Sequence, residues 1–397
     1  MNTSANTSSP MPDQVRAEAV IDLAAVAANI ERLRASSSAD VMVVVKADGY
    51  GHGDVAIARH ARDIGVSWLG VALPAEALAL RDAGDEGSIL AWLLTPGQGD
   101  TVECVMRDVD LGVSDRWALE EIAGIGRDTG MMPRVHLKVD TGLGRGGVSW
   151  TKWPELVRRA RVLRDEGVLD VVGVWSHLAS GEQPDSEITA AQARVFADAL
   201  EVVDDAGLQP RWIHLANSGA VLNGSENSWG FEQTLVRCGI ATYGITPGLA
   251  LGDSAALGLR PAMTLQARLA VVKEVPVGHG VSYGHLWTAA APTVLGLLPL
   301  GYADGLPRTA RNPEVLVEGR RRPIIGRIAM DQCVLDLGAP DEVGDIEAGT
   351  AVTVFGPGAK GEPTAEDWAD WADTIGYEIV TRIGPRVPRR YVEETRA

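Results

Sequence analysis

Five charged or nucleophilic side chains lie at or shortly after the ends of apolar segments in the first 245 residues. They are Lys46, Arg145, His177, Ser218 and Arg237. A lysine at the end of an apolar strand loses hydration, which lowers its pKa and lets the neutral amine form a Schiff base. Arginines bind planar anions through two hydrogen bonds, and backbone N–H groups beside glycines reach phosphates. A phosphorylated aldehyde cofactor, pyridoxal phosphate, would use all of these groups.

The segments that must position these side chains alternate with stretches of helical periodicity, which is typical of repeated βα units. Eight strands with helical crossovers indicate a (β/α)₈ barrel, or TIM barrel. Because barrel enzymes carry their reactive groups at the C-terminal ends of the strands, we expect the five side chains to meet at one mouth. The predicted strands are 41–46, 68–73, 88–94, 109–114, 134–140, 171–176, 211–216 and 235–244.

The sequence after residue 250 changes, because Gly and Pro now punctuate alternating apolar and polar residues. This pattern predicts a second, mostly β domain with one helix over 364–376. We therefore expect a disordered tail at 1–12, a cofactor-binding (β/α)₈ barrel at 13–250 and a C-terminal, mostly β domain at 251–397.

Composition and charge argue against several classes of protein. The 36 basic and 53 acidic residues give a net charge of −17, which disfavours nucleic acids and anionic membranes as partners. No segment has the length of apolar sequence that spans a membrane, and the N-terminus lacks the pattern of a signal peptide, so we expect a cytoplasmic protein. The three cysteines and seven histidines match no metal-ligand spacing, so we expect no metal site.

One motif supports a different chemistry. GLGRGG at 142–147 matches the G-x-G-x-x-G pattern of dinucleotide-binding folds, with Asp165 at about the spacing of a ribose-binding acid. It follows the fifth predicted strand rather than opening a dinucleotide-binding unit, and Arg145 lies inside it. A dinucleotide-dependent oxidoreductase is therefore the weaker hypothesis.

Several longer motifs follow one another along nearly the whole chain. They are VVVKADGYGHG (43–53), LKVDTGLGRGG (137–147), WSHLA, IHLANS, VRCGIATYG, VSYGHLW, GYADG, GRIAMDQ and YEIVTRIGPRVPRRY (377–391). This series resembles the alanine racemases, pyridoxal-phosphate enzymes of fold type III with a barrel and a C-terminal β domain. The resemblance implies a homodimeric isomerase that interconverts L-alanine and D-alanine and supplies D-alanine for peptidoglycan precursors.

The resemblance also implies which residues do the chemistry. Lys46 matches the lysine that holds the cofactor and acts as one catalytic base, and Tyr283 matches a second base donated across the dimer interface. One base on each face is the direct way to remove a proton from Cα and return it on the other side. Arg237 matches the arginine that hydrogen-bonds the pyridine nitrogen. Since a guanidinium does not readily give up a proton, that nitrogen should stay unprotonated.

Further matches imply contacts with the cofactor. His177 corresponds to a histidine that supports Arg237, and Asn217 lies beside the phosphate cradle. The cradle itself corresponds to Tyr50, Ser218, Gly239, Ile240 and Tyr377.

The remaining matches imply contacts with the amino-acid substrate. Arg145 and the backbone of Met330 correspond to the groups that bind its carboxylate. Tyr302 and Asp331 match positions at the entrance and around the site. Lys138 matches a lysine that is often carbamylated in the family, which would turn a buried cation into an anion able to orient Arg145.

The chain departs from the usual family pattern at Asp48, Gly49 and Leu143, where many members have Asn, Ala and Met. These positions adjoin the reactive residues, so the preference between alanine and serine or another small amino acid stays open. A non-enzymatic pyridoxal-phosphate protein is disfavoured by the second domain. A decarboxylase of the same architecture is disfavoured by Arg237, because such enzymes usually place an acid at the ring nitrogen.

Overall fold

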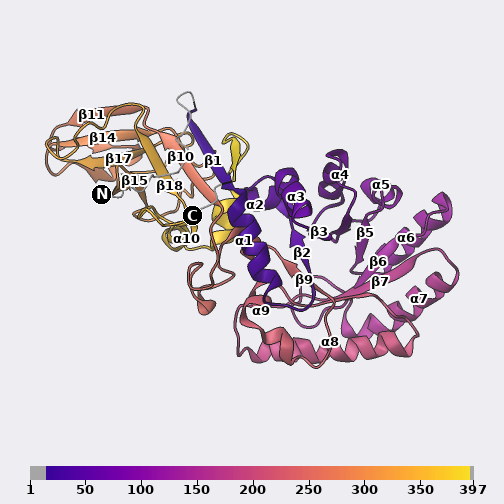
Figure 1. The fold of residues 1–397 in the computed structure, drawn as a ribbon. Helices are drawn as coiled ribbons and strands as arrows, with labels where there is room; N and C mark the ends of the chain where they lie inside the picture. Colours follow the sequence, from indigo (N-terminus) through magenta and orange to yellow (C-terminus); the bar gives the residue numbers. More distant parts are fainter. Residues whose placement is uncertain (1–14, 394–397) are drawn as a thin grey trace.

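The computed structural model describes residues 15–393, so the tail predicted at 1–12 lies outside the described part of the chain. Figure 1 shows a helix-covered barrel on the right and a domain made mostly of strands on the left. The described part of the chain starts with a strand of the β domain, then builds the barrel, and finally returns to complete the β domain. The predicted combination of a (β/α)₈ barrel and a mostly β domain is confirmed.

Eight parallel strands form the barrel, which confirms the predicted number. An isolated bridge between Asn217 and Arg237 brings the two ends of the sheet together. The last strand ends at Cys238 rather than at residue 244, because a 3₁₀ turn, η3 (Ile240–Tyr243), follows Gly239. The strands are β2 (Asp40–Val44), β3 (Trp68–Val71), β4 (Ser88–Ala91), β5 (Asp110–Val113), β6 (Arg134–Lys138), β7 (Asp170–Trp175), β8 (Trp212–His214) and β9 (Leu235–Cys238).

Helices surround the barrel (Figure 1). α6 (Arg116–Thr129) is typical, because the Asp115 side chain caps its first turn and Gly130 ends it in a left-handed conformation. None of the helices within residues 15–393 has both the length and the apolar composition needed to span a membrane. The others are α1 (Leu23–Arg34), α3 (Asp54–Asp63), α4 (Pro74–Asp82), α5 (Asp100–Met106), α7 (Trp153–Asp165), α8 (Glu187–Asp205) and α9 (Ser218–Asn223).

The β domain contains a nine-stranded sheet. Its strand β1 (Ala17–Asp22) pairs antiparallel with β10 (Met263–Arg268) and parallel with β19 (Arg389–Val392). Residues 17–22 therefore lie in this sheet rather than in the barrel expected for 13–250. The remaining elements are β11 (Val271–Val275), β12 (Gly280–Val281), β13 (Trp287–Thr288), β14 (Thr293–Leu298), β15 (Glu314–Val317), β16 (Arg320–Ile325), β17 (Cys333–Gly338), β18 (Ala351–Phe355), α10 (Ala365–Ala372) and α11 (Gly376–Thr381).

Candidate active site

The short segment α2 (Lys46–Gly51) carries two predicted site residues, Lys46 and Tyr50, directly after strand β2. Its residues 47–50 have φ between 53° and 58°, so the backbone forms a left-handed turn. Each residue other than glycine costs about 1–2 kcal/mol in this conformation. The carboxylate of Glu76 accepts a hydrogen bond from the N–H of Ala47 at 2.7 Å. Glu76 thus anchors the strained turn that presents Lys46.

The amine of Lys46 lies near two aromatic rings. Its Nζ is 5.8 Å from the ring centroid of Tyr50 and 5.8 Å from that of Trp92. Burial, followed by the charge of Arg145, lowers the pKa of Lys46 below its usual value, whereas Glu76 acts in the opposite direction. A larger fraction of the amine is therefore neutral, which is the form that attacks an aldehyde.

The guanidinium of Arg237 is held inside the barrel, with 5% of the residue exposed. Its Nη1 donates to the carbonyl and Nδ1 of His214 at 2.9 and 3.0 Å, and its Nη2 donates to the carbonyls of Ser176 and Leu215 at 2.7 and 3.1 Å. Nδ1 of His177 lies 3.4 Å from Nη2, at the far limit of a hydrogen bond. Burial lowers the pKa of Arg237 to about 9, so it remains charged at neutral pH. No acceptor within residues 15–393 hydrogen-bonds its Nε–H, which is left for another partner.

The predicted phosphate contacts lie together between the barrel and α11. Ser218 Oγ accepts a hydrogen bond from the Gly239 N–H at 3.0 Å, and the rings of Tyr50 and Tyr377 have centroids 6.3 Å apart. A Cβ at Gly239 would lie 2.3 Å from the Tyr50 hydroxyl, so a larger residue here would displace the Tyr50 ring. Ile240 opens a 3₁₀ turn, and the first N–H groups of a helical turn lack intrahelical acceptors. These hydroxyl and N–H groups suit a phosphate.

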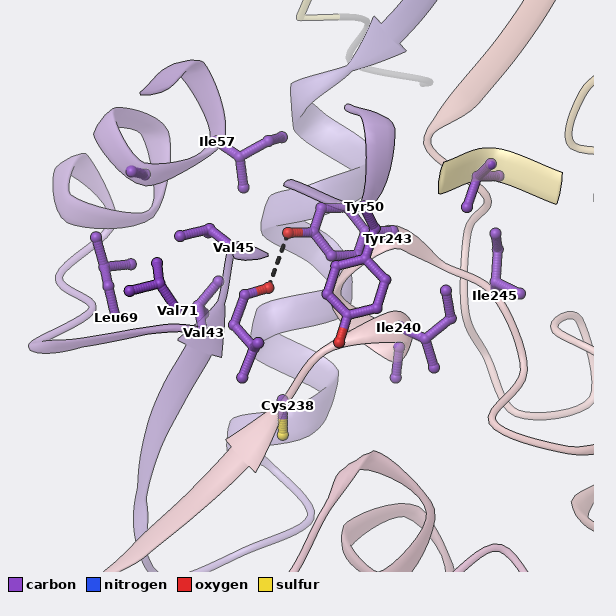
Figure 2. Close-up of a cluster of buried hydrophobic side chains, with 14 of the residues drawn as sticks. Val43, Val45, Tyr50, Ile57, Leu69, Val71, Cys238, Ile240, Tyr243 and Ile245 are labelled. Atoms are coloured by element: carbon purple, nitrogen blue, oxygen red, sulfur yellow. Dashed lines mark hydrogen bonds between the residues drawn. The ribbon is translucent and has the colours of Figure 1, made fainter. Parts of the chain in front are cut away.

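Buried neighbours hold this cradle in place. Figure 2 shows Tyr50 beside Tyr243, whose hydroxyl donates to the carbonyl of Val44 at 2.9 Å. The centroids of the two rings are 5.0 Å apart. Asn217 lies next to the cradle, as the resemblance implies, and its side chain caps α9 by accepting from the N–H of Ala220 at 3.2 Å. The cradle is therefore built on buried and half-buried groups that support one another.

Lys138 ends β6, and Arg145 follows it in the next loop. The Lys138 Nζ lies 4.2 Å from the ring centroid of Trp175, and no residue in the described range accepts a hydrogen bond from it. Burial, together with the charges of Arg237 and Arg145, lowers the pKa of Lys138 to about 8. The Arg145 side chain is exposed. The structure thus places both residues close enough to the other barrel residues to affect their protonation.

The candidate residues described so far lie on or next to the barrel, and we call them the barrel group. The other predicted residues lie on the β domain. Tyr283, Tyr302 and Met330 are 71%, 37% and 53% exposed. The Tyr302 N–H donates to the carbonyl of Ala329 at 3.1 Å, which joins two of the loops, and Asp331 follows in the second loop. Within residues 15–393, no hydrogen bond or ring contact links Tyr283 to the barrel. One chain therefore presents two separate groups of candidate residues.

Sequence reasoning missed several residues of the barrel group. Glu76, Trp92, Trp175 and His214 all contact Lys46, Lys138, Arg237 or their supporting backbone. Strand alternation was an available signal for Trp175, which lies two residues before the predicted site residue His177. Among residues 15–393, no group of three or more His, Cys, Asp or Glu side chains is arranged to hold a metal ion.

Two family models match the chain. One, described as alanine racemase, N-terminal domain, matches residues 21–247, and the other, described as alanine racemase, C-terminal domain, matches residues 262–391.

Individual proteins agree with this assignment. The alanine racemase of Frankia casuarinae is 50% identical over 392 residues, which cover 98% of this chain and 100% of that protein. The alanine racemase of Streptomyces coelicolor is 50% identical over 387 residues, which cover 96% and 97%. The crystal structure of alanine racemase from Streptomyces lavendulae superposes with a TM-score of 0.92 at 48% identity, covering 97% of this chain and 99% of that one. The chain therefore belongs to the alanine racemase family and is a racemase, an isomerase.

Proposed function

We propose that this protein interconverts L-alanine and D-alanine with pyridoxal phosphate bound at Lys46, as a homodimer in which Tyr283 reaches the partner subunit's barrel. The observation that carries the proposal is that the candidate residues of the barrel and those of the β domain form two separate groups in one chain. The barrel holds a partly desolvated lysine, an arginine and a phosphate cradle, whereas Tyr283 is 71% exposed on the other domain. A second copy can bring the two groups together.

The barrel residues fit the cofactor. The neutral amine of Lys46 suits its aldehyde, the Tyr50, Ser218 and Gly239 groups suit its phosphate, and the Nε–H of Arg237 suits its ring nitrogen. When bound, pyridoxal phosphate would link to the amino group and provide a ring that stabilises negative charge on Cα. Because Arg237 is a donor that keeps its protons, it would leave the ring nitrogen unprotonated and limit that stabilisation.

Two bases would then move the proton at Cα. The Nζ of Lys46 accepts or returns it on one face, and the hydroxyl of Tyr283 does so on the opposite face. Arg145 and the backbone N–H of Met330 would hold the substrate carboxylate, which keeps Cα between the two bases. Tyr302 and Asp331 would line the approach to the site.

A carbamate on Lys138 would complete the barrel group. The neutral amine attacks carbon dioxide, forms an N–C bond and releases a proton. The product is an anion that can pair with Arg145, whereas the ammonium of Lys138 lies among positive charges. Replacing the positive ammonium by a negative group among these cations favours the carbamate of Lys138.

Mixed dimers test the proposed sharing of the site. Lys46→Ala and Tyr283→Phe should each be inactive as homodimers. In a heterodimer of the two variants, one site has both bases and the other has neither, so random exchange of subunits should restore roughly one quarter of wild-type activity. Failure to restore activity, with heterodimers demonstrated by mass spectrometry, would show that the two bases act within one chain.

Reduction with borohydride tests the attachment site independently. It should fix the cofactor on the peptide that contains Lys46, and the label should be absent from the Lys46→Ala variant. A label on Lys138 in the wild-type protein would contradict the assignment.

The cellular role and the domain boundary are part of the same proposal. D-alanine would supply peptidoglycan precursors, so deletion of the gene should make growth depend on added D-alanine. All three cysteines are free and buried, which suits a reducing cytoplasm.

We place the boundary between the barrel and the β domain near residue 250. Comparison of kcat/KM for alanine and serine would decide between alanine and the closest alternative substrate.

A further inference from the structure

A chain of buried polar groups crosses the interior of the barrel behind Arg237. Nη1 of Arg237 lies 3.0 Å from Nδ1 of His214, and Nε2 of His214 lies 2.9 Å from Nδ1 of His136. Nε2 of His136 lies 3.1 Å from Oδ2 of Asp110. The four residues come from β9, β8, β6 and β5, and each is at most 5% exposed. We call these four residues the barrel relay.

The guanidinium at one end of the barrel relay fixes which atom donates and which accepts in each hydrogen bond. A guanidinium only donates, so Nδ1 of His214 must accept. Burial, followed by the charge of Arg237, holds the pKa of His214 well below its usual value, so the ring is neutral and its proton lies on Nε2. That proton is donated to Nδ1 of His136. His136 must then carry its proton on Nε2 and donate it to Asp110.

The other end of the relay is fixed in the same way. Oδ1 of Asp110 accepts from Nε of Arg134 at 2.6 Å, and Arg134 is also only a donor. Arg134 pairs as well with the exposed carboxylate of Asp108. Asp110 therefore accepts with both oxygens, one toward Arg134 and one toward His136. Both ends require the same tautomer of each histidine.

Ring packing prevents the histidines from turning away. His214 stacks on Trp175 with centroids 5.5 Å apart and an angle of 5° between the planes. His136 makes an edge contact with Trp68 at 5.6 Å. A merely space-filling role would need neither the carboxylate nor this sequence of donors and acceptors.

We propose that Asp110 is a positioning residue that, through His136, sets the tautomer of His214 and so keeps an acceptor facing Arg237. The role of Arg237 at a ring nitrogen rests on the proposed function, whereas the protonation pattern of the relay does not. The relay gives Asp110, near the opposite end of the barrel from the site, control over the orientation of the guanidinium.

Asp110→Asn should reverse the direction of hydrogen-bond donation along the barrel relay, with almost no change in the shape of the side chain. Arg134 still requires an oxygen, so the amide NH₂ is left facing Nε2 of His136. That nitrogen must then accept, the His136 proton moves to Nδ1, and the His214 proton moves from Nε2 to Nδ1. No proton is gained or lost by either ring, but an N–H of His214 now faces the N–H of Arg237.

The test is ¹⁵N NMR of the complete, cofactor-loaded protein labelled at its seven histidines. Assignments come from the variants His136→Phe and His214→Gln. In the wild-type protein, both rings should show a protonated Nε2 and an unprotonated Nδ1. Asp110→Asn should move the proton to Nδ1 in both rings. Asp108→Asn is the control, because it removes a charge from the same arginine without touching a histidine, and its spectrum should match the wild type.

Activity gives a second readout. Asp110→Asn should lower kcat by about 10- to 100-fold, as expected when a supporting hydrogen bond is lost, with a smaller effect on KM. A wild-type spectrum with either ring protonated at Nδ1 would overturn the proposal, and this holds even if Asp110→Asn fails to fold. An unchanged histidine spectrum in folded Asp110→Asn would also overturn it.

Discussion

Replacing Glu76 by Gln should loosen the turn that carries Lys46. One oxygen of Glu76 accepts a single hydrogen bond, from the Ala47 N–H at 2.7 Å. The other accepts two, from the N–H groups of Ala72 and Leu73 at 2.9 Å each. Glutamine keeps one oxygen, which is best placed where two donors meet. Its NH₂ group then faces the Ala47 N–H, and that donor loses its acceptor.

The expected magnitude follows from this single lost acceptor. A backbone donor left without an acceptor costs about 1–3 kcal/mol, which corresponds to ~5- to 150-fold in the equilibrium for local opening. The left-handed residues Ala47, Asp48 and Tyr50 already cost about 3–6 kcal/mol together. The turn is therefore strained before the loss, and the missing acceptor should add directly to its tendency to open.

Amide hydrogen exchange measured by mass spectrometry checks this prediction. Exchange over residues 44–53 should accelerate by that factor in Glu76→Gln. Glu121→Gln is the matched control, because it removes the same charge from a carboxylate that accepts from the Gly97 N–H at 3.1 and 3.2 Å. The reasoning is wrong if exchange over 44–53 does not change, or if the control accelerates it equally.

Three further predictions follow from individual contacts. Gly51→Ala should cost more than about 3 kcal/mol in the free energy of unfolding, because its φ is +80° and a Cβ would lie 2.2 Å from the carbonyl of Val380. Gly65→Ala has the same φ and open space around it, so it should cost only about 1–2 kcal/mol; equal urea midpoints for the two would refute this. Tyr243→Phe should lose about 1–2 kcal/mol by removing a buried hydrogen bond of 2.9 Å, and a melting curve identical to that of the wild type would contradict it. Lys138 has a pKa of about 8, and only its neutral amine reacts with carbon dioxide, so a ¹³C carbamate signal from labelled bicarbonate should grow as the pH rises through that value. The signal should vanish in Lys138→Gln, and its persistence there would place the carbamate elsewhere.

Much of the barrel could be predicted from the sequence, because eight apolar segments that alternate with stretches of helical periodicity are compatible with few other folds. The candidate site positions came from the same pattern, since Lys46, His177 and Ser218 lie shortly after the ends of strands. β1 was different, because its pairing partner β10 lies more than 200 residues away and local sequence carries no sign of it. The sheet to which a strand belongs depends on such distant pairing.

Two features of the site depend on context that local patterns do not carry. Ala47, Asp48 and Tyr50 adopt a conformation that such residues avoid, and hydrogen bonds such as the one to Glu76, together with the surrounding packing, stabilise it. The barrel relay is partly visible in retrospect, because His136 and Lys138 are two residues apart and so share a face of β6. The two hydrogen-bond partners of His136, His214 and Asp110, come from two other strands, and their meeting requires the closed barrel.

Racemisation in deuterium oxide tests the central claim most directly. The protein, loaded with pyridoxal phosphate, is incubated with L-alanine. The two enantiomers are separated by chiral chromatography, and their deuterium content is measured by mass spectrometry. The account predicts D-alanine that carries deuterium at Cα, with neither racemisation nor exchange in Lys46→Ala. A wild-type protein with the cofactor demonstrably bound that gives neither D-alanine nor deuterated L-alanine would contradict the account.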